Sequence, residues 1–370
     1  MIAIKEEKLA AYNSTYPKGG VSCSKDSFMV NQTLVFQIKF YGKSPIFAKP
    51  KPFEVMPQTE DLINLKKMKN ENKRAIFKNI LRAKKICKYS LLMLLFFVTS
   101  YASAIPPNFT IKEIKFVSEG VSLAGTIFTP TNVQAAVVIV HGSGQEKRMI
   151  NFATILANNG IAVLTYDKRG VGESAGLYAG PEVGTNNVDF SNLNLLSLDA
   201  SAAVNTLSKS LSNDQIPLGL IGASQAGWII PLAAEKNKKV KFMTILSGAL
   251  ITVKEQLRFQ FYTDGDKNFW DSHSEEDARK HVFNDPDRYE FIDTNPNDIL
   301  SKLSIPGLWI FGGTDIQVPV NLSIEYLDIL KSKGKHYEYK LFPSLGHNTA
   351  FSDSEEPMKD VINWVKNIDR

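Results

Sequence analysis

The sequence contains little cysteine. Only Cys23 and Cys87 occur among its 370 residues, and neither lies in the stretch 105–370. Residues 105–370 can therefore contain no disulfide, no thiolate metal site and no cysteine nucleophile. An oxidising compartment is permitted by this composition, but it is not indicated.

The larger part of the chain also lacks the excess of basic residues that a nucleic-acid-binding face requires. Residues 1–104 contain 18 Lys and Arg against 7 Asp and Glu, whereas the remaining residues contain 25 against 31. The net positive charge therefore belongs to the N-terminal segment. A phosphate-binding surface needs clustered Lys and Arg, so no nucleic-acid partner is expected.

The sequence has no apolar run of the ~20 residues that cross a bilayer. Segment 84–104 instead combines a Lys-rich flank, the eight apolar residues Leu91–Val98 and the small residues Ala102–Ala104. This order is typical of a signal peptide. It predicts cleavage after Ala104, export to the periplasm or the exterior, and no stable membrane span after processing. A buried core helix and membrane anchoring by this segment are the alternatives.

The signal-peptide-like segment begins late in the chain, behind an N-terminal extension of residues 1–83. A start at Met68 would place a long basic region directly before the apolar run. Residues 1–67 show no clear hydrophobic periodicity, and with that start they would not be translated. A small N-terminal domain is the alternative.

The stretch 105–370 has a natural size for one α/β domain. Strand-like runs alternate in it with helical stretches, and most of the runs are too uniformly apolar for a half-exposed sheet. Helical crossovers between such strands give a parallel sheet. We therefore expect an α/β fold with a mostly parallel eight-stranded sheet flanked by helices, its strands at 111–117, 121–128, 135–140, 161–166, 217–222, 241–248, 307–313 and 336–342.

Residues 249–306 interrupt this alternation. They contain no strand-like run, they are rich in charged and aromatic residues, and they are too many for an ordinary connection. We expect a helical cap insertion above the sheet, with Phe261 and Trp270 contributing to substrate binding. Aromatic packing within the insertion alone is the alternative.

The strongest chemical signal is the sequence GASQAG at 222–227, where an apolar strand leads directly into a helix. A nucleophile on such a sharp turn needs small residues two positions to either side, and Gly222 and Ala226 meet that need. Ser224 is thus the candidate nucleophile. The alternative is an ordinary glycine-containing connection between strand and helix.

A serine hydroxyl needs a base, and the base needs an oriented partner. His347 follows the last strand next to a glycine, and Asp315 follows the preceding strand in the sequence FGGTD. The order Ser, Asp, His along the chain is one of the orders in which such triads occur. Parallel strands bring such residues to one edge of a sheet. A surface histidine and an Asx turn are the alternatives.

The backbone N–H groups of Gln225 and Ser143 are the candidate donors to a developing oxyanion. Gln225 follows the nucleophile, and Ser143 belongs to the sequence HGSG, whose glycines allow close backbone approach. His141 in the same sequence is interpreted as structural. Asp167 and Arg169, after the neighbouring strand, are expected to brace the loops.

Together these residues resemble the α/β-hydrolase superfamily, and within it the bacterial serine esterase and dienelactone-hydrolase-like group. The resemblance covers about 111–368 and rests on HGSG, YDKRGVGES, GASQAG, FGGTDIQVP and the closing GH. Ala226 departs from the commonest pattern, which has glycine there. The resemblance implies Asp315 and His347 as acid and base, and hydrolysis of an acyl bond without a metal or an organic cofactor.

The leading hypothesis is a carboxylesterase that acts on a small-molecule ester through an acyl-enzyme intermediate. An aminopeptidase-type serine peptidase would share the triad and could bind the substrate amine with Glu275, Glu276 or Asp277. An acyl thioesterase and a non-catalytic binding protein on the same scaffold are further alternatives. The oligomeric state is not indicated by the sequence.

Overall fold

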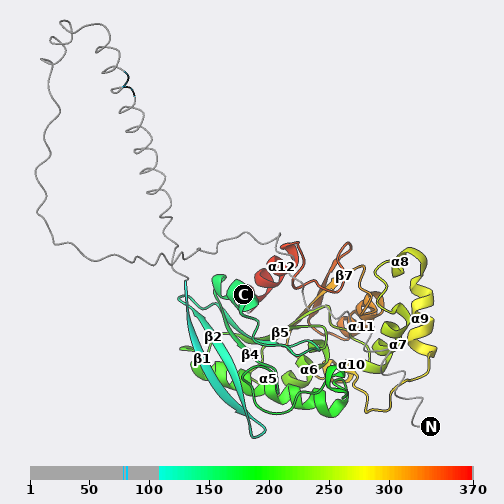
Figure 1. The fold of residues 1–370 in the computed structure, drawn as a ribbon, viewed down its shortest axis with the longest axis horizontal. Helices are drawn as coiled ribbons and strands as arrows, with labels where there is room; N and C mark the ends of the chain where they lie inside the picture. Colours follow the sequence, from blue (N-terminus) through cyan, green and yellow to red (C-terminus); the bar gives the residue numbers. More distant parts are fainter. Residues whose placement is uncertain (1–77, 79–80, 82–107, 369–370) are drawn as a thin grey trace, which may run out of the picture. The chain divides into compact units, whose positions relative to one another are not determined.

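The computed structural model describes residues 108–368, together with positions 78 and 81 (Figure 1). The predicted N-terminal extension and the signal-peptide-like segment 84–104 lie outside the described residues, apart from those two positions. Among the described residues, no helix combines the length and the hydropathy needed to cross a membrane.

The core of residues 108–368 is one eight-stranded sheet in the order β1-β2-β4-β3-β5-β6-β7-β8. Strand β2 is antiparallel to β1 and β4, and all other neighbours are parallel. The predicted mostly parallel eight-stranded sheet is therefore confirmed. Its strands are β1 Phe109–Ser118, β2 Val121–Pro130, β3 Ala135–Val140, β4 Ile161–Tyr166, β5 Leu218–Ala223, β6 Phe242–Leu246, β7 Gly307–Gly312 and β8 Tyr337–Phe342.

Helices cover both faces of the sheet (Figure 1). Strand β3 shows why: every residue in it is buried, and alternate residues join two different apolar clusters. Val137 and Ile139 pack in the cluster of α4 and α12, whereas Val138 and Val140 pack in that of α5, α6 and α11. These helices span Ile150–Asn158 (α4), Glu356–Lys366 (α12), Phe190–Ser210 (α5), Ala226–Lys236 (α6) and Val320–Ser332 (α11).

The chain between β6 and β7 is helical, and no strand occurs there among the described residues. Its first helix begins at a capping box, in which Thr252 and Glu255 each bond the other's backbone N–H. Phe259 and Phe269 are fully buried and pack edge to face. Phe259 belongs to the same apolar cluster as α5, α6 and α11, so the insertion packs onto the main core. The helices are α7 Val253–Thr263, α8 Phe269–Ser272, α9 Glu275–Asn284 and α10 Pro296–Leu300.

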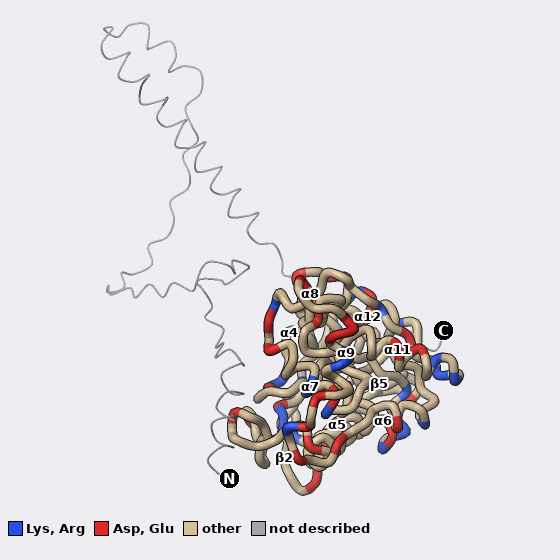
Figure 2. Tube along the Cα trace, turned by 90° about the vertical axis from the view of Figure 1, so that its right-hand side faces the viewer, with Lys and Arg blue, Asp and Glu red and all other residues tan. Residues whose placement is uncertain are grey.

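Acidic and basic residues are intermixed along the described trace (Figure 2). Two ion pairs between such residues are largely buried. Arg169 donates through Nε to Asp199 at 3.0 Å, and both side chains are almost wholly buried. Arg148 binds Asp167 and links the turn after β4 to β1 through Glu113.

Candidate active site

Ser224 lies on the turn that joins β5 to α6, with a left-handed backbone φ of 55°. A non-glycine residue with this φ is strained and is found where a surrounding structure enforces it. The enforcement is visible at Gly222, where a Cβ would lie 2.4 Å from the Val140 carbonyl oxygen and 2.6 Å from the Ala226 Cβ. With alanine at 226, only glycine fits at 222.

Backbone hydrogen bonds hold this turn on both sides. The Ser224 N–H donates to the Leu246 carbonyl at 2.9 Å, and the Gly227 N–H donates to the Ser224 carbonyl at 2.8 Å. The Ser224 side chain is half-buried, and its hydroxyl makes no hydrogen bond to another described residue. The backbone of Ser224 is thus fixed, while its hydroxyl remains available for reaction.

Asp315 and His347 are brought together as the sequence predicted. His347 Nδ1 lies 2.8 Å from Asp315 Oδ2, and the Asp315 side chain is completely buried. The other carboxylate oxygen, Oδ1, accepts the backbone N–H groups of Gln317 at 2.7 Å and Val318 at 3.0 Å. All of these bonds suit an ionised carboxylate, which fixes the imidazole ring with Nδ1 as donor.

The loop that carries His347 is tied to neighbouring strand ends. The Thr314 N–H donates to the Leu345 carbonyl at 2.9 Å, and the hydroxyls of Ser247 and Thr349 are 2.8 Å apart in the interior. These contacts join the ends of β6, β7 and the loop after β8. The histidine therefore stands on a braced loop rather than on a free one.

The three predicted catalytic residues follow strands β5, β7 and β8. In the sheet these strands belong to the run β5-β6-β7-β8, so only β6 separates β5 from β7. Asp315 and His347 are in contact, whereas no hydrogen bond joins Ser224 and His347 among the described residues. Catalytic hydrogen bonds are often long in the absence of substrate. The joint action of the three residues as a triad stays a prediction.

The HGSG loop lies beside the serine turn because β3 and β5 are paired up to Val140 and Gly222. Within the described residues, the N–H groups of Ser143 and Gln225 donate to no protein group. The preceding N–H, that of Gly142, is occupied by Glu146 Oε2 at 2.9 Å. The two predicted oxyanion donors therefore remain unpaired.

His141 is a structural residue. Its ring is buried, and Nε2 lies 2.6 Å from the Tyr166 carbonyl oxygen. Burial, together with the nearby Lys168, lowers the pKa of His141 to about 3. The imidazole is thus neutral, and its hydrogen bond to the Tyr166 carbonyl links the ends of β3 and β4.

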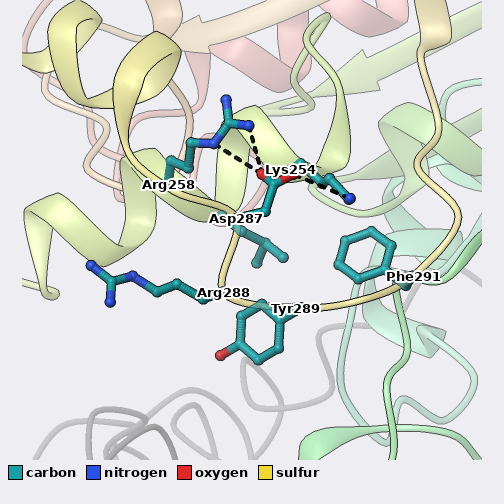
Figure 3. A pocket seen from close by; sticks show the side chains of 7 residues that line it. Lys254, Arg258, Asp287, Arg288, Tyr289 and Phe291 are labelled. Carbon is teal, nitrogen blue, oxygen red and sulfur yellow. Dashed lines mark hydrogen bonds and ion pairs between the residues drawn. The ribbon is translucent and has the colours of Figure 1, made fainter.

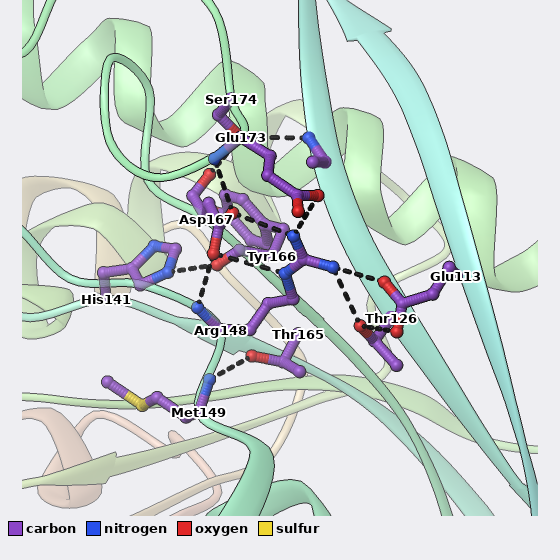
Figure 4. A network of polar contacts seen from close by, with 11 residues as sticks. Glu113, Thr126, His141, Arg148, Met149, Thr165, Tyr166, Asp167, Glu173 and Ser174 are labelled. Atoms are coloured by element: carbon purple, nitrogen blue, oxygen red, sulfur yellow. Dashed lines mark hydrogen bonds and ion pairs between the residues drawn. The ribbon is translucent and has the colours of Figure 1, made fainter.

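Asp167 and its neighbours form the polar network of Figure 4. The Asp167 carboxylate accepts from Arg148 Nη2 at 3.0 Å and from the Glu173 N–H at 2.9 Å. Burial opposes its ionisation, but these bonds outweigh burial and lower its pKa. A Cβ at Gly172, where φ is 59°, would lie 2.6 Å from the same carboxylate. The bracing role predicted for Asp167 and Arg169 is confirmed.

Lys168 is a residue of this site that the sequence analysis did not single out. Its side chain is about 1% exposed. Its Nζ lies 2.7 Å from the Gly142 carbonyl oxygen and 3.1 Å from Gln225 Oε1. The sequence places Lys168 between a buried strand and a glycine-containing turn, which could have suggested a role in the site. Lysines are rarely buried, however, so this position alone does not predict one.

The two predicted substrate-binding aromatics differ in their surroundings. Trp270 is half-buried, and its Nε1–H donates to the Asp315 carbonyl oxygen at 3.0 Å, which joins the insertion to the loop of the catalytic acid. Phe261 is 48% exposed, and the Arg288 guanidinium lies 3.4 Å from the centre of its ring. Of the two, Trp270 is the one with a hydrogen bond to a predicted catalytic residue within the described part of the chain.

A surface hollow occurs in the insertion itself (Figure 3). Asp287 lies at its centre, where Arg258 Nε donates to the carboxylate at 3.1 Å and Lys254 Nζ lies 3.2 Å from it. None of the predicted catalytic residues lines this hollow. Its lining is Lys254, Leu257, Arg258, Asp287, Arg288, Tyr289 and Phe291.

The acidic residues that an aminopeptidase could use are engaged locally at the start of α9. Glu275 pairs with Arg279 at 3.1 Å, and Glu276 pairs with Lys280 at 3.4 Å. The Asp277 carboxylate accepts from the Ser274 hydroxyl at 2.7 Å and lies 3.5 Å from Lys280 Nζ. Among the described residues, no group of three or more His, Cys, Asp or Glu side chains could hold a metal ion.

Comparisons with known proteins agree with this architecture. The family described as serine aminopeptidase, S33, matches residues 131–297. An esterase structure from Pyrococcus furiosus is 20% identical, with a TM-score of 0.51 over 70% of this chain and 90% of that one. An acylaminoacyl peptidase from Pyrococcus horikoshii is 17% identical, with a TM-score of 0.51 over 70% of this chain and 41% of that one. No curated protein sequence matches significantly.

The sheet order, the strained serine turn and the buried Asp–His pair define an α/β-hydrolase architecture. Residues 108–368 thus have the α/β-hydrolase fold, and residues 131–297 within them match the serine aminopeptidase family model.

Proposed function

We propose that this protein is a serine hydrolase that cleaves carboxylic esters through an acyl-enzyme intermediate. The observation that carries the proposal is the hydrogen bond of 2.8 Å between His347 Nδ1 and the buried Asp315, at the same sheet edge as the strained Ser224. The Asp315 carboxylate is buried and held by two backbone N–H groups, so it keeps the His347 ring in one orientation. Such a pair is what a general base needs.

The proposed mechanism follows from this geometry. With Nδ1–H donated to Asp315, His347 Nε2 is the free acceptor that takes the proton of Ser224 as its oxygen attacks the ester carbonyl. The N–H groups of Gln225 and Ser143 then stabilise the oxyanion. The alcohol leaves with the proton returned by His347, and a water molecule activated in the same way frees the acid.

A serine peptidase is the second candidate, because the matching family is described as a serine aminopeptidase. Such an enzyme must hold the charged amine of its substrate. The carboxylates at the start of α9 already have cationic or hydroxyl partners, which favours an ester or another uncharged acyl substrate. An acyl thioester is the third candidate, since it uses the same acyl transfer.

The test is a panel of p-nitrophenyl esters of graded chain length, aminoacyl p-nitroanilides and acyl thioesters. We expect the highest kcat/KM for one of the esters. A preference for an aminoacyl amide or for a thioester would replace the ester proposal within the same mechanism. Failure to turn over any acyl compound would overturn it.

We further propose that the insertion determines which acyl chain is accepted. The Trp270 indole donates to the Asp315 carbonyl, so it is anchored beside the loop of the proposed catalytic acid. Replacing Trp270 or Phe261 with alanine should change the ratio of kcat/KM between long-chain and short-chain esters about 10-fold or more. Each methylene in an apolar pocket contributes about 1–3 kcal/mol of discrimination. Cleavage of the shortest ester should change little.

Phe283 provides a matched control for this measurement. It lies in the same insertion and is also 48% exposed. The Phe283→Ala variant should retain the wild-type chain-length profile. If the Phe261 and Trp270 variants retain it as well, with unchanged thermal unfolding, these two side chains serve packing and do not contact the acyl chain.

We also propose that the protein is exported and processed after Ala104. The Lys-rich flank, the run Leu91–Val98 and the sequence Ala-Ser-Ala motivate this. Mass spectrometry of the protein from its native cell should show an N-terminus at Ile105. A membrane-bound chain that retains segment 84–104 would support anchoring instead, and a cytosolic chain beginning at Met1 would exclude export.

A further inference from the structure

Lys168 is the most deeply buried cation at the proposed active site. Its Nζ faces the carbonyl oxygens of three successive residues, Gly142 at 2.7 Å, Ser143 at 3.4 Å and Gly144 at 3.2 Å. It also lies 3.1 Å from the side-chain oxygen of Gln225. One ammonium group therefore contacts the loop of one proposed oxyanion donor and the side chain of the other.

The geometry of a trans peptide gives these contacts a consequence. In each planar peptide unit, the C=O and the following N–H point in opposite directions. Because the Gly142 carbonyl points at Lys168, the Ser143 N–H of the same peptide unit points away from Lys168. Rotation of this unit would break the shortest of the four contacts.

The second donor is fixed through its side chain. Gln225 is about 1% exposed, and its Nε2 donates to the Asn187 carbonyl at 2.9 Å while its Oε1 accepts from Lys168. Both ends of the amide are thus held. The Gln225 backbone, which carries the other N–H, is anchored between α6 and these two partners.

We propose that Lys168 is a positioning residue that holds the Ser143 and Gln225 N–H groups in the orientation an oxyanion requires. The inference rests on the proposed function, since it concerns how the same hydrolytic site is assembled. Lys168 does not contact the reacting atoms; it acts through the two backbone donors. A misplacement of about 1 Å in such a group can cost ~10²-fold in rate.

Protonation of Lys168 is part of this arrangement. Burial lowers the pKa of Lys168 to about 8, and the carboxylates of Glu146 and Glu182 oppose that shift. His141 also faces it but stays neutral, and the Tyr178 ring lies 5.8 Å away. As pH rises through about 8, the ammonium loses its charge and one of its three donor protons. The wild-type kcat should therefore fall over this range.

The test compares two variants on the shortest p-nitrophenyl ester that the wild type cleaves. Lys168→Met retains the stem but has no donor, and we expect kcat to fall about 30–100-fold with KM within about threefold. Lys168→Arg retains a cation that does not titrate below pH 12, so the fall of kcat near pH 8 should disappear. Lys335→Met is the matched control, because Lys335 Nζ also donates to a carbonyl, that of Leu303 at 2.8 Å.

The outcomes separate this inference from the proposed function. An active wild type whose kcat is unchanged in Lys168→Met overturns the positioning role alone, whereas a wild type that hydrolyses no acyl substrate overturns the function itself. If Lys168→Met does not fold, the pH profiles decide. A wild-type kcat that is constant from pH 7 to 10, or an alkaline fall that persists in Lys168→Arg, contradicts the inference.

Discussion

Replacing Ser224 with alanine is expected to lower kcat on activated esters by ~10⁴–10⁶-fold. The mutation removes the nucleophile, and the remaining groups can only bind and polarise the ester. The fold should persist, because alanine and serine have the same strain at a φ of 55° and the Ser224 hydroxyl makes no hydrogen bond to a described residue. The midpoint of thermal unfolding should therefore stay close to that of the wild type.

The matched control is Ser344→Ala. Ser344 is exposed and lies on the loop between β8 and His347, so its loss tests a serine near the site that has no chemical role. Its kcat should match the wild type. A Ser224→Ala preparation free of wild-type enzyme that retains more than a few per cent of activity would place the nucleophile elsewhere. Covalent labelling of the wild type with a fluorophosphonate, followed by peptide mapping, gives an independent assignment.

The strands were the most predictable elements, for a simple physical reason. The run AAVVIV was predicted as a strand over 135–140, and β3 spans these residues. A strand buried on both faces needs apolar residues at every position, and β-branched residues favour the extended backbone. The sheet order was not predictable in this way. That β2 pairs with β4 depends on contacts between residues distant in the chain.

Helix boundaries were less well predicted, because the capping residue at each end determines where a helix begins or stops. The stretch 193–209, which is rich in Leu and Ala, predicts a helix from the sequence alone, whereas α5 spans Phe190–Ser210. Asp189 caps its start by accepting the Ser191 N–H at 2.7 Å. The apolar periodicity used for the prediction begins only where the helix meets the core, about one turn later, at Leu193.

The sequence predicted those site residues whose chemical role also requires a particular turn sequence. It did not predict residues that reach the site only through tertiary packing. Ser224 was predicted as the nucleophile from its small neighbours, and the structure shows the close approach that requires glycine at 222. Lys168 was missed because burial of a lysine depends on tertiary structure. Strands β3 and β4 are parallel neighbours, and this pairing places the residue after β4 beneath the loop after β3. The surroundings of Phe261 were hidden for the same reason.

The second large effect is expected for Asp315→Asn. Asp315 Oδ1 accepts two backbone N–H groups, at 2.7 and 3.0 Å, so an asparagine must place its only oxygen there. Its NH₂ group then faces His347 Nδ1, which must become an acceptor. The imidazole proton moves to Nε2, and His347 can no longer take the proton of Ser224. A loss of ~10⁴-fold in kcat follows from the wrong tautomer, with little change in packing.

Measurement of kcat and of thermal unfolding tests this argument, with Asp328→Asn as the control. Asp328 lies on α11, pairs with Lys331 at 3.6 Å and has a side chain that is 53% exposed, so its replacement should change neither quantity. If Asp315→Asn keeps kcat within about 10-fold of the wild type, the carboxylate does not set the tautomer of the base. If it loses both activity and stability, Asp315 serves mainly to hold its loop together through the Gln317 and Val318 N–H groups. Loss of kcat with an unchanged unfolding midpoint separates the catalytic role of the Asp315–His347 bond from a structural one.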